Sequence, residues 1–136
     1  MRLWGEAVCT TPAAFAKYEA GVASGLLPKG AWAGLSVLTL SDEETVFAAE
    51  LSSRLGAGER TCISAARHRQ GILVSDDLDA RKVAQQHGVA TTGTIGILVL
   101  WVQHDLLSRD EVNALLMDLI AAGYRAPIDN VDSLLE

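Results

Sequence analysis

Short runs of β-type residues alternate with helical segments along the whole chain, and this alternation narrows the fold more than any other feature. The predicted strands span residues 6–9, 35–40, 71–75 and 89–92. The predicted helices span residues 13–22, 41–55, 59–68, 78–88, 95–103 and 108–123. Strands that alternate with helices indicate an α/β domain with a mostly parallel sheet.

Signals at the helix starts support these boundaries. Thr11 suits an N-cap, and Pro12 follows it at the first helical position, where proline is favoured. Ser41 and Ser108 are each followed three residues later by a glutamate, which is the capping-box pattern. The sequence therefore predicts where three of the helices begin.

Composition limits the class of protein. Of the 136 residues, 49% are hydrophobic, which is enough to bury a core, so we expect residues 1–136 to form one globular domain. We find neither a membrane span nor a secretory signal in the sequence and expect a cytoplasmic protein. Cys9 and Cys62 lack metal-ligand spacing, and we expect both to be buried, reduced thiols.

The charge balance bears on nucleic-acid binding. Seventeen acidic residues against eleven basic ones give a net charge of −6. Broad electrostatic binding to nucleic acid requires a basic face, so this balance argues against it. A nuclease remains compatible with the balance, because the acidic residues of a metal site contribute to it.

Three carboxylates, those of Asp76, Asp77 and Asp79, directly follow the apolar strand 71–75. Ligands of open α/β sheets bind beyond the carboxyl ends of the strands. Clustered carboxylates repel one another, a divalent cation relieves that repulsion, and Mg²⁺ and Mn²⁺ prefer oxygen ligands. The alternative is structural: Asp77 caps the next helix and Asp79 lies favourably at its positive end. Spacing alone leaves both interpretations open.

Several ordered segments resemble a known family. They are TPAAFAKYE at 11–19, LGAGE at 55–59, ISAA at 63–66, ILVSDD at 72–77, ARKVA at 80–84, TGTIGIL at 92–98 and AAGYR at 121–125. Together they resemble a PIN domain, and they are similar to a branch of predicted PIN-domain proteins encoded as toxin-like partners of small antitoxins.

The resemblance implies a three-layer α/β/α fold with a parallel sheet, and a ribonuclease that depends on Mg²⁺ or Mn²⁺. It implies that Glu19, Glu59 and Asp77 are catalytic acids, and that they bind the metal together with Asp76. It also implies an RNA substrate, a small antitoxin partner and a homodimer. The alternative function is a catalytically inactive PIN-like module that binds a protein or RNA.

The sequence departs from the family pattern at its start. The family's first strand, which ends in a fourth acid and lies in the middle of the sheet, has no counterpart before Glu6. We consider three explanations: a misplaced translation start, a degenerate member that closes its sheet without the strand, and a strand supplied by a second molecule. Direct pairing of residues 7–9 with 72–74 in a monomer would favour the second explanation over the third.

Overall fold

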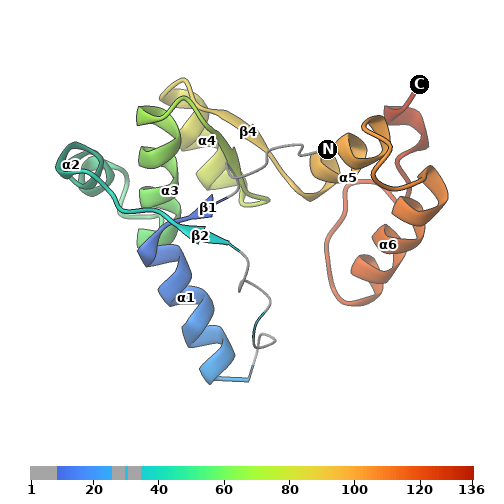
Figure 1. The fold of residues 1–136 in the computed structure, drawn as a ribbon, viewed down its shortest axis with the longest axis horizontal. Coiled ribbons are helices and arrows are strands. Elements are labelled where there is room, and N and C mark those ends of the chain that lie inside the picture. The colour runs from blue at the N-terminus through green and yellow to red at the C-terminus, as the bar shows by residue number, and fades with distance from the viewer. Residues whose placement is uncertain (1–8, 26–29, 31–34) are drawn as a thin grey trace. The chain divides into compact units, whose positions relative to one another are not determined.

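The computed structural model describes residues 9–25, 30 and 35–136, and this part of the chain is a mixed α/β structure (Figure 1). In chain order its elements are β1 (Cys9–Thr10), α1 (Pro12–Ala23), β2 (Ser36–Val37), α2 (Asp42–Glu50), α3 (Ala57–His68), β3 (Ile72–Val74), α4 (Leu78–Gln86), β4 (Ala90–Thr92), α5 (Thr94–Gln103), α6 (Arg109–Ala121) and the 3₁₀ turn η2 (Asp132–Leu134). None of these helices combines the length and the apolar character needed to cross a bilayer. The chain divides into two compact units, Met1–Thr91 and Thr92–Glu136.

The strands form two separate pairs. β1 pairs with β2 in parallel, with Cys9 opposite Ser36 and Thr10 opposite Val37. β3 pairs with β4, and among the described residues β1 and β3 do not pair. Residues 7 and 8, part of the pairing considered above, lie outside the described residues. The mixed α/β class is thus confirmed, whereas the three-layer arrangement lacking one βα unit stays a prediction.

The predicted helix starts are confirmed by their hydrogen bonds. Thr11 Oγ1 accepts a bond from the backbone N–H of Ala14 at 3.3 Å, and Pro12 is the first residue of α1. Ser41 and Ser108 each form the reciprocal capping box with the glutamate three residues on. Each cap satisfies N–H groups that the helix itself leaves without partners.

The predicted helix 41–55 is wrong at its end, because α2 stops at Glu50. Leu51 adopts an extended backbone, and Ser52 Oγ then accepts a bond from the N–H of Arg54 at 3.3 Å. Serine side chains compete in this way for backbone groups that would otherwise continue a helix. The next helix correspondingly begins two residues early, at Ala57.

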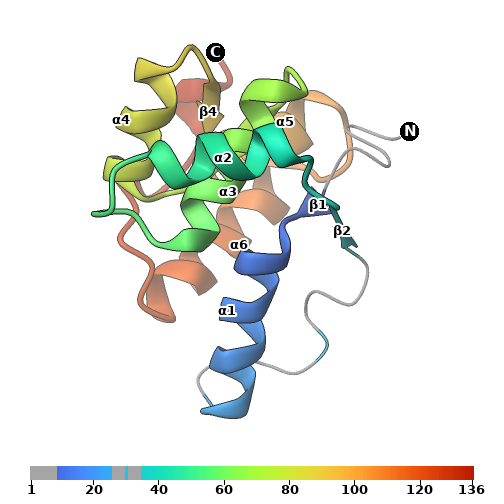
Figure 2. The ribbon, with the colours of Figure 1, turned by 90° about the vertical axis from the view of Figure 1, so that its left-hand side faces the viewer.

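In the first unit, α3 is the central element (Figures 1 and 2). It contacts α1, α2, α4 and β3. The apolar core beside it consists of buried residues from α3, β3, α4 and the adjoining loops: Leu51, Leu55, Ile63, Leu73, Ala80, Ala84 and Val89. α1 packs closely on α3 because Gly58 has no side chain: a Cβ there would lie 3.2 Å from Ala14 Cα.

A partly buried ion pair joins α2 to the end of α3. The carboxylate of Glu44, a residue only 3% exposed, accepts two bonds from Arg69, at 2.8 Å from Nε and 2.9 Å from Nη2. Arg69 Nη2 also donates to the backbone oxygen of Thr39 at 2.8 Å. The bonds from Arg69 lower the pKa of Glu44 to about 2, with a contribution from Ser41 and against the opposing effect of burial. The pair thereby ties the chain after β2 to the end of α3.

The second unit is built on α5 and α6. Its buried core consists of Leu98, Val112, Leu116 and Val131, which brings the segment before η2 against α6. Asn113 fixes that segment: its Oδ1 accepts the N–H of Val131 at 2.9 Å, and its Nδ2 donates to Asp132 Oδ1 at 3.0 Å. The Asn113 amide thus helps to hold the tail on the apolar core, together with the ion pair between Arg109 Nε and Asp132 Oδ1 at 3.8 Å.

Both cysteines stand outside any disulfide, but the predicted burial of Cys9 is wrong, because this residue is exposed on β1. β1 is only two residues long, so it offers too little sheet to cover the side chain. Cys62 is partly buried, and this burial raises the pKa of its thiol. Its Sγ lies 3.6 Å from Thr11 Oγ1, at the contact between α1 and α3.

Candidate functional site

The first turns of α3 and α4 lie at the same end of the first unit. In the order α3–β3–α4 each helix packs against the strand between them, and in such α/β connections the helices run antiparallel to the strand, so we infer that α3 and α4 run in the same direction. Near their C-terminal ends, Arg67 Nη1 donates to the backbone oxygen of His87 at 2.7 Å. Their N-terminal ends therefore share the edge where β3 ends, and this is where α/β sheets bind ligands. We call it the acidic edge, after its residues Glu59, Asp76 and Asp77.

Asp77 is exposed and serves as the N-cap of α4. Its Oδ1 accepts the backbone N–H groups of Asp79 at 2.8 Å and Ala80 at 3.3 Å. Within the described residues its second oxygen, Oδ2, accepts no hydrogen bond. The structural role predicted for Asp77 is confirmed, and one carboxylate oxygen is left for another partner.

Glu59 stands in the first turn of α3 and is used mainly by its own helix. Its Oε2 accepts the N–H of Gly56 at 2.8 Å, which is half of a capping box. Its Oε1 lies 3.7 Å from the ammonium of Lys17 on α1. Because the Lys17 side chain is 75% exposed, this ion pair is loose and contributes little to stability.

The other two predicted site residues are exposed. Glu19 lies on the solvent side of α1, and Asp76 lies in the loop after β3. Within residues 9–25, 30 and 35–136, no three His, Cys, Asp or Glu side chains come close enough together to hold a metal ion. The described structure thus puts Glu59 in the first turn of α3 and Asp76 and Asp77 just before α4, and it does not gather the four predicted acids into one cluster.

The carboxylates at the acidic edge fit a metal site that water and substrate complete, and not a site built from protein ligands alone. They do not form an all-protein cage of three or four carboxylates. Mg²⁺, however, commonly keeps several waters and binds through one or two carboxylates plus the phosphates of its substrate. Asp77, with a fixed carboxylate and one oxygen to spare, and the adjacent Asp76 fit this second kind of site.

The sequence patterns do not mark Arg60, the basic residue beside Glu59, as functional. Arg60 is partly buried, and its Nε–H is fully buried without a hydrogen-bond acceptor. Among the described residues the guanidinium also forms no ion pair. The one signal in the sequence is its position, directly after the acid that opens α3.

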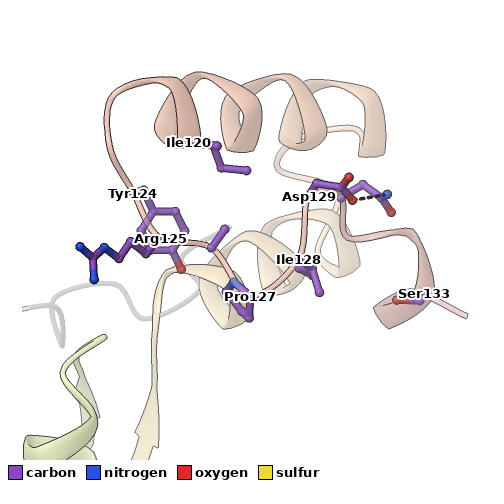
Figure 3. A pocket seen from close by; sticks show the side chains of 9 residues that line it. Ile120, Tyr124, Arg125, Pro127, Ile128, Asp129 and Ser133 are labelled. Carbon is purple, nitrogen blue, oxygen red and sulfur yellow. Dashed lines mark hydrogen bonds between the residues drawn. The ribbon is translucent and has the colours of Figure 1, made fainter.

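The second unit has an open hollow of about 670 Å³ below the end of α6 (Figure 3). Ile120 points into it from α6, whereas Arg125 extends away from the other labelled side chains (Figure 3). Asp129 lies at the other end, with its Oδ1 bonded to the side-chain N–H of Asn130 at 3.1 Å. The lining is mixed and no motif marks it, so we assign this hollow no role.

The comparisons with known proteins give one match. Residues 29–136 match a family model described as a PIN domain. No curated protein and no solved structure matches the chain. The matched range contains Glu59, Asp76 and Asp77, whereas Glu19 precedes it. Since the match covers well over half of the sequence, the chain belongs to the PIN domain family.

Proposed function

We propose that this protein is a PIN-type ribonuclease that depends on Mg²⁺ or Mn²⁺ and uses the acidic edge as its site. One observation carries the proposal: Asp77 is exposed directly after β3, with one carboxylate oxygen fixed by the N-cap and the other accepting no bond from the described residues. Membership in the PIN family supports it.

In this proposal each acid has a defined task. Asp77 and Asp76 hold the ion together with water and a phosphate of the RNA, and the N-cap bonds keep the Asp77 carboxylate in place. Glu59 and Glu19 are further metal-binding acids, and Glu59 becomes available when the loosely paired Lys17 moves away. A bound divalent ion activates a water molecule and offsets the charge that develops on the scissile phosphate.

A second candidate function is a non-catalytic PIN module that binds RNA or a protein. Glu59 favours it, because one of its carboxylate oxygens accepts a bond from the start of its own helix and the other lies near Lys17. The two functions differ in one measurable property, which is whether RNA is cut when a divalent ion is supplied.

The test is cleavage of a labelled single-stranded RNA with Mn²⁺, comparing the wild type with Asp77→Asn. Asparagine is as good an N-cap as aspartate, so the variant keeps the start of α4. We expect its rate to fall by about a hundredfold, the scale of removing one electrostatic stabiliser from an active site. The matched control is Asp110→Asn, an exposed first-turn aspartate of α6, which keeps the wild-type rate.

Three outcomes separate the candidates. Loss of cleavage in Asp77→Asn alone supports the ribonuclease. Equal cleavage by wild type and Asp77→Asn contradicts the assigned site. Absence of Mn²⁺-dependent cleavage by the wild-type chain favours the non-catalytic module.

The wider role that we propose is that of a cytoplasmic toxin with a small antitoxin protein as partner and a homodimer as its assembly. The sequence similarity to the toxin-like branch supports the antitoxin. The apolar character of α5 gives the homodimer little support. Leu98 is buried in the core of its own unit, and Ile95, Val99 and Trp101 pack against that core. Growth arrest on expression that Asp77→Asn abolishes would support the toxin, and sedimentation equilibrium measures the assembly.

A further inference from the structure

We infer that the outer side of α2 docks a basic, amphipathic helix of a partner protein. The inference goes beyond the proposed function, because neither the proposed metal site nor RNA cleavage involves this helix. α2 lies across α3 (Figure 2), and Ser64 Oγ of α3 donates to the backbone oxygen of the buried Glu44 at 2.6 Å. The outer side of α2 borders an open hollow of about 380 Å³, which we call the α2 groove. The α2 groove is lined by Asp42, Glu43, Val46, Phe47, Glu50 and His68.

The floor of the α2 groove is apolar and held in place by the neighbouring helices. Phe47 packs partly against the core of the first unit. The rings of His68 and His87 meet the Phe47 ring edge-on at centroid distances of 5.4 and 5.2 Å, and the guanidinium carbon of Arg67 lies 5.1 Å from its centroid. Next to this fixed ring, Val46 is 58% exposed. Fixed aromatic and aliphatic side chains are the anchors that supply most of the binding energy at protein interfaces.

The rim of the α2 groove carries three carboxylates. Asp42 and Glu43 stand in the first turn of α2, where the positive end of the helix dipole favours them. Glu50 is the last residue of α2, where the negative end of the dipole disfavours an acid. Within the part of the chain that the structure describes, none of the three takes part in an ion pair. Natural proteins break such local rules mainly at functional positions, and Glu50 is one such exception.

The order of these groups along α2 specifies the chemistry of the partner. Acids at positions 42 and 43, apolar side chains at 46 and 47 and an acid at 50 follow one another at intervals of about one turn. A partner helix with apolar residues between two lysines or arginines, one turn to either side, matches this order in charge, and helices dock in grooves through residues at this spacing.

The same charges argue against other occupants of the α2 groove. RNA and anionic lipid carry negative charge, which three carboxylates repel. A second copy of this chain brings a net charge of −6 and is also repelled. The occupant that we propose is therefore a basic segment of a different protein.

The position of Glu50 separates a binding role from a structural one. Glutamine at this position removes an unfavourable charge from the end of α2. Glu50→Gln should therefore keep or raise the melting temperature while it weakens binding of the partner helix. A lower melting temperature in Glu50→Gln would show that the acid serves the fold and would contradict the inference.

The experiment measures binding of a synthetic, fluorescein-labelled helical peptide to the full chain by anisotropy. The peptide carries two adjacent leucines with a lysine one turn to either side, and in a control peptide both lysines are glutamates. We expect the double variant of Glu43→Gln with Glu50→Gln to raise Kd about tenfold, the scale of losing two exposed ion pairs. The matched control, Asp110→Asn with Asp118→Asn, removes two exposed acids from α6 and should change Kd less than about twofold.

A second pair of variants tests the apolar floor. Val46→Thr keeps the branched shape of the side chain and replaces one methyl group by a hydroxyl. It should raise Kd about fourfold, the scale of one methyl group that binding buries. Met117→Thr is the control, because Met117 is a similarly exposed apolar residue of α6, and its variant should leave Kd unchanged.

Every other outcome overturns the inference. Absence of binding by the wild type, or equal binding of the lysine and glutamate peptides, would remove the basic partner. Equal losses in the two double variants would show a general attraction between a cationic peptide and an acidic protein. Wild-type affinity in Val46→Thr would show that the peptide does not contact the floor. Cleavage of RNA with Mn²⁺ is measured separately and does not depend on α2, so failure of the docking site leaves the ribonuclease proposal standing.

Discussion

The two units of this chain differ in the interactions that stabilise each of them internally. Among the described residues, the buried polar side chains all lie in the first unit: Thr10, Thr11, Glu44 and Ser64. The buried side chains of the second unit are purely apolar. The charge is also uneven, because residues 92–136 contain two arginines and seven acidic residues, a net charge of −5 out of the chain's −6.

This difference has a consequence for function. Hydrogen bonds and ion pairs depend on direction, so a unit built with them holds its side chains in defined orientations, as a catalytic or binding site requires. Apolar packing is less directional, and a strongly acidic surface repels RNA. The contrast favours the first unit, which contains Asp77, as the place of the RNA site that we propose.

The largest expected effect is the loss of apolar packing in the second unit. Leu116 is completely buried in α6, and Leu116→Ala should lower the free energy of unfolding by about 3 kcal/mol. Its neighbour Met117 is 54% exposed and provides the control, since Met117→Ala should cost less than about 0.5 kcal/mol. Urea denaturation with hydrogen exchange at α5 and α6 measures both. Equal costs would contradict an apolar core centred on Leu116.

The next effect is the loss of the partly buried ion pair in the first unit. Glu44→Gln leaves Arg69 with a neutral partner and should cost about 2 kcal/mol, less than a fully buried pair because the Arg69 side chain is 41% exposed. Glu43→Gln, at the exposed neighbouring position, should change little. Amide hydrogen exchange should become faster in α2 and α3. A cost as small as that of Glu43→Gln would mean that the first unit does not depend on this pair.

The same pair should make the first unit sensitive to acid. The pKa of Glu44 is lowered from 4.5 to about 2 in the folded chain. A lowered pKa stabilises the folded state above pH 4.5, and this contribution is lost as the pH falls from about 5 toward 2. The difference in unfolding free energy between wild type and Glu44→Gln should therefore shrink over this range. Urea midpoints at pH 6, 4 and 3 measure it, and a constant difference would contradict the assigned pKa shift.

Local patterns predicted the elements but not the contacts between them. Caps such as Thr11 and Asp77 act within a few residues, so their partners can be read from neighbouring positions. The bond from Arg69 to Glu44 spans 25 positions, and nothing in either neighbourhood indicates it. The ends of elements are harder to predict than their starts. α2 stops at Glu50, and Ser52 then accepts a backbone N–H that would continue a helix, an effect that periodicity does not detect.

The residues of the candidate site likewise differ in how far the sequence predicts them. Asp76 and Asp77 stand out in the sequence because they follow a short, apolar predicted strand, and the structure places them after β3. Glu19 and Glu59 were assigned from the resemblance alone, and the capping role of Glu59 follows from where α3 begins. Arg60 could not be identified beforehand, because an unpaired donor is recognised only when its surroundings are known.

The smallest expected effect tests Asn113, a polar anchor of the second unit. Asn113→Ala removes the bonds to Val131 and Asp132 and should cost about 1 kcal/mol, the usual net value of such bonds. The loss should be local, so that amide exchange accelerates in residues 129–136 while α5 and α6 stay protected. Ser133→Ala, at an exposed position of η2, is the control. If Asn113→Ala costs as much as Leu116→Ala, a polar contact supports the second unit as strongly as its core, and the contrast between the two units is lost.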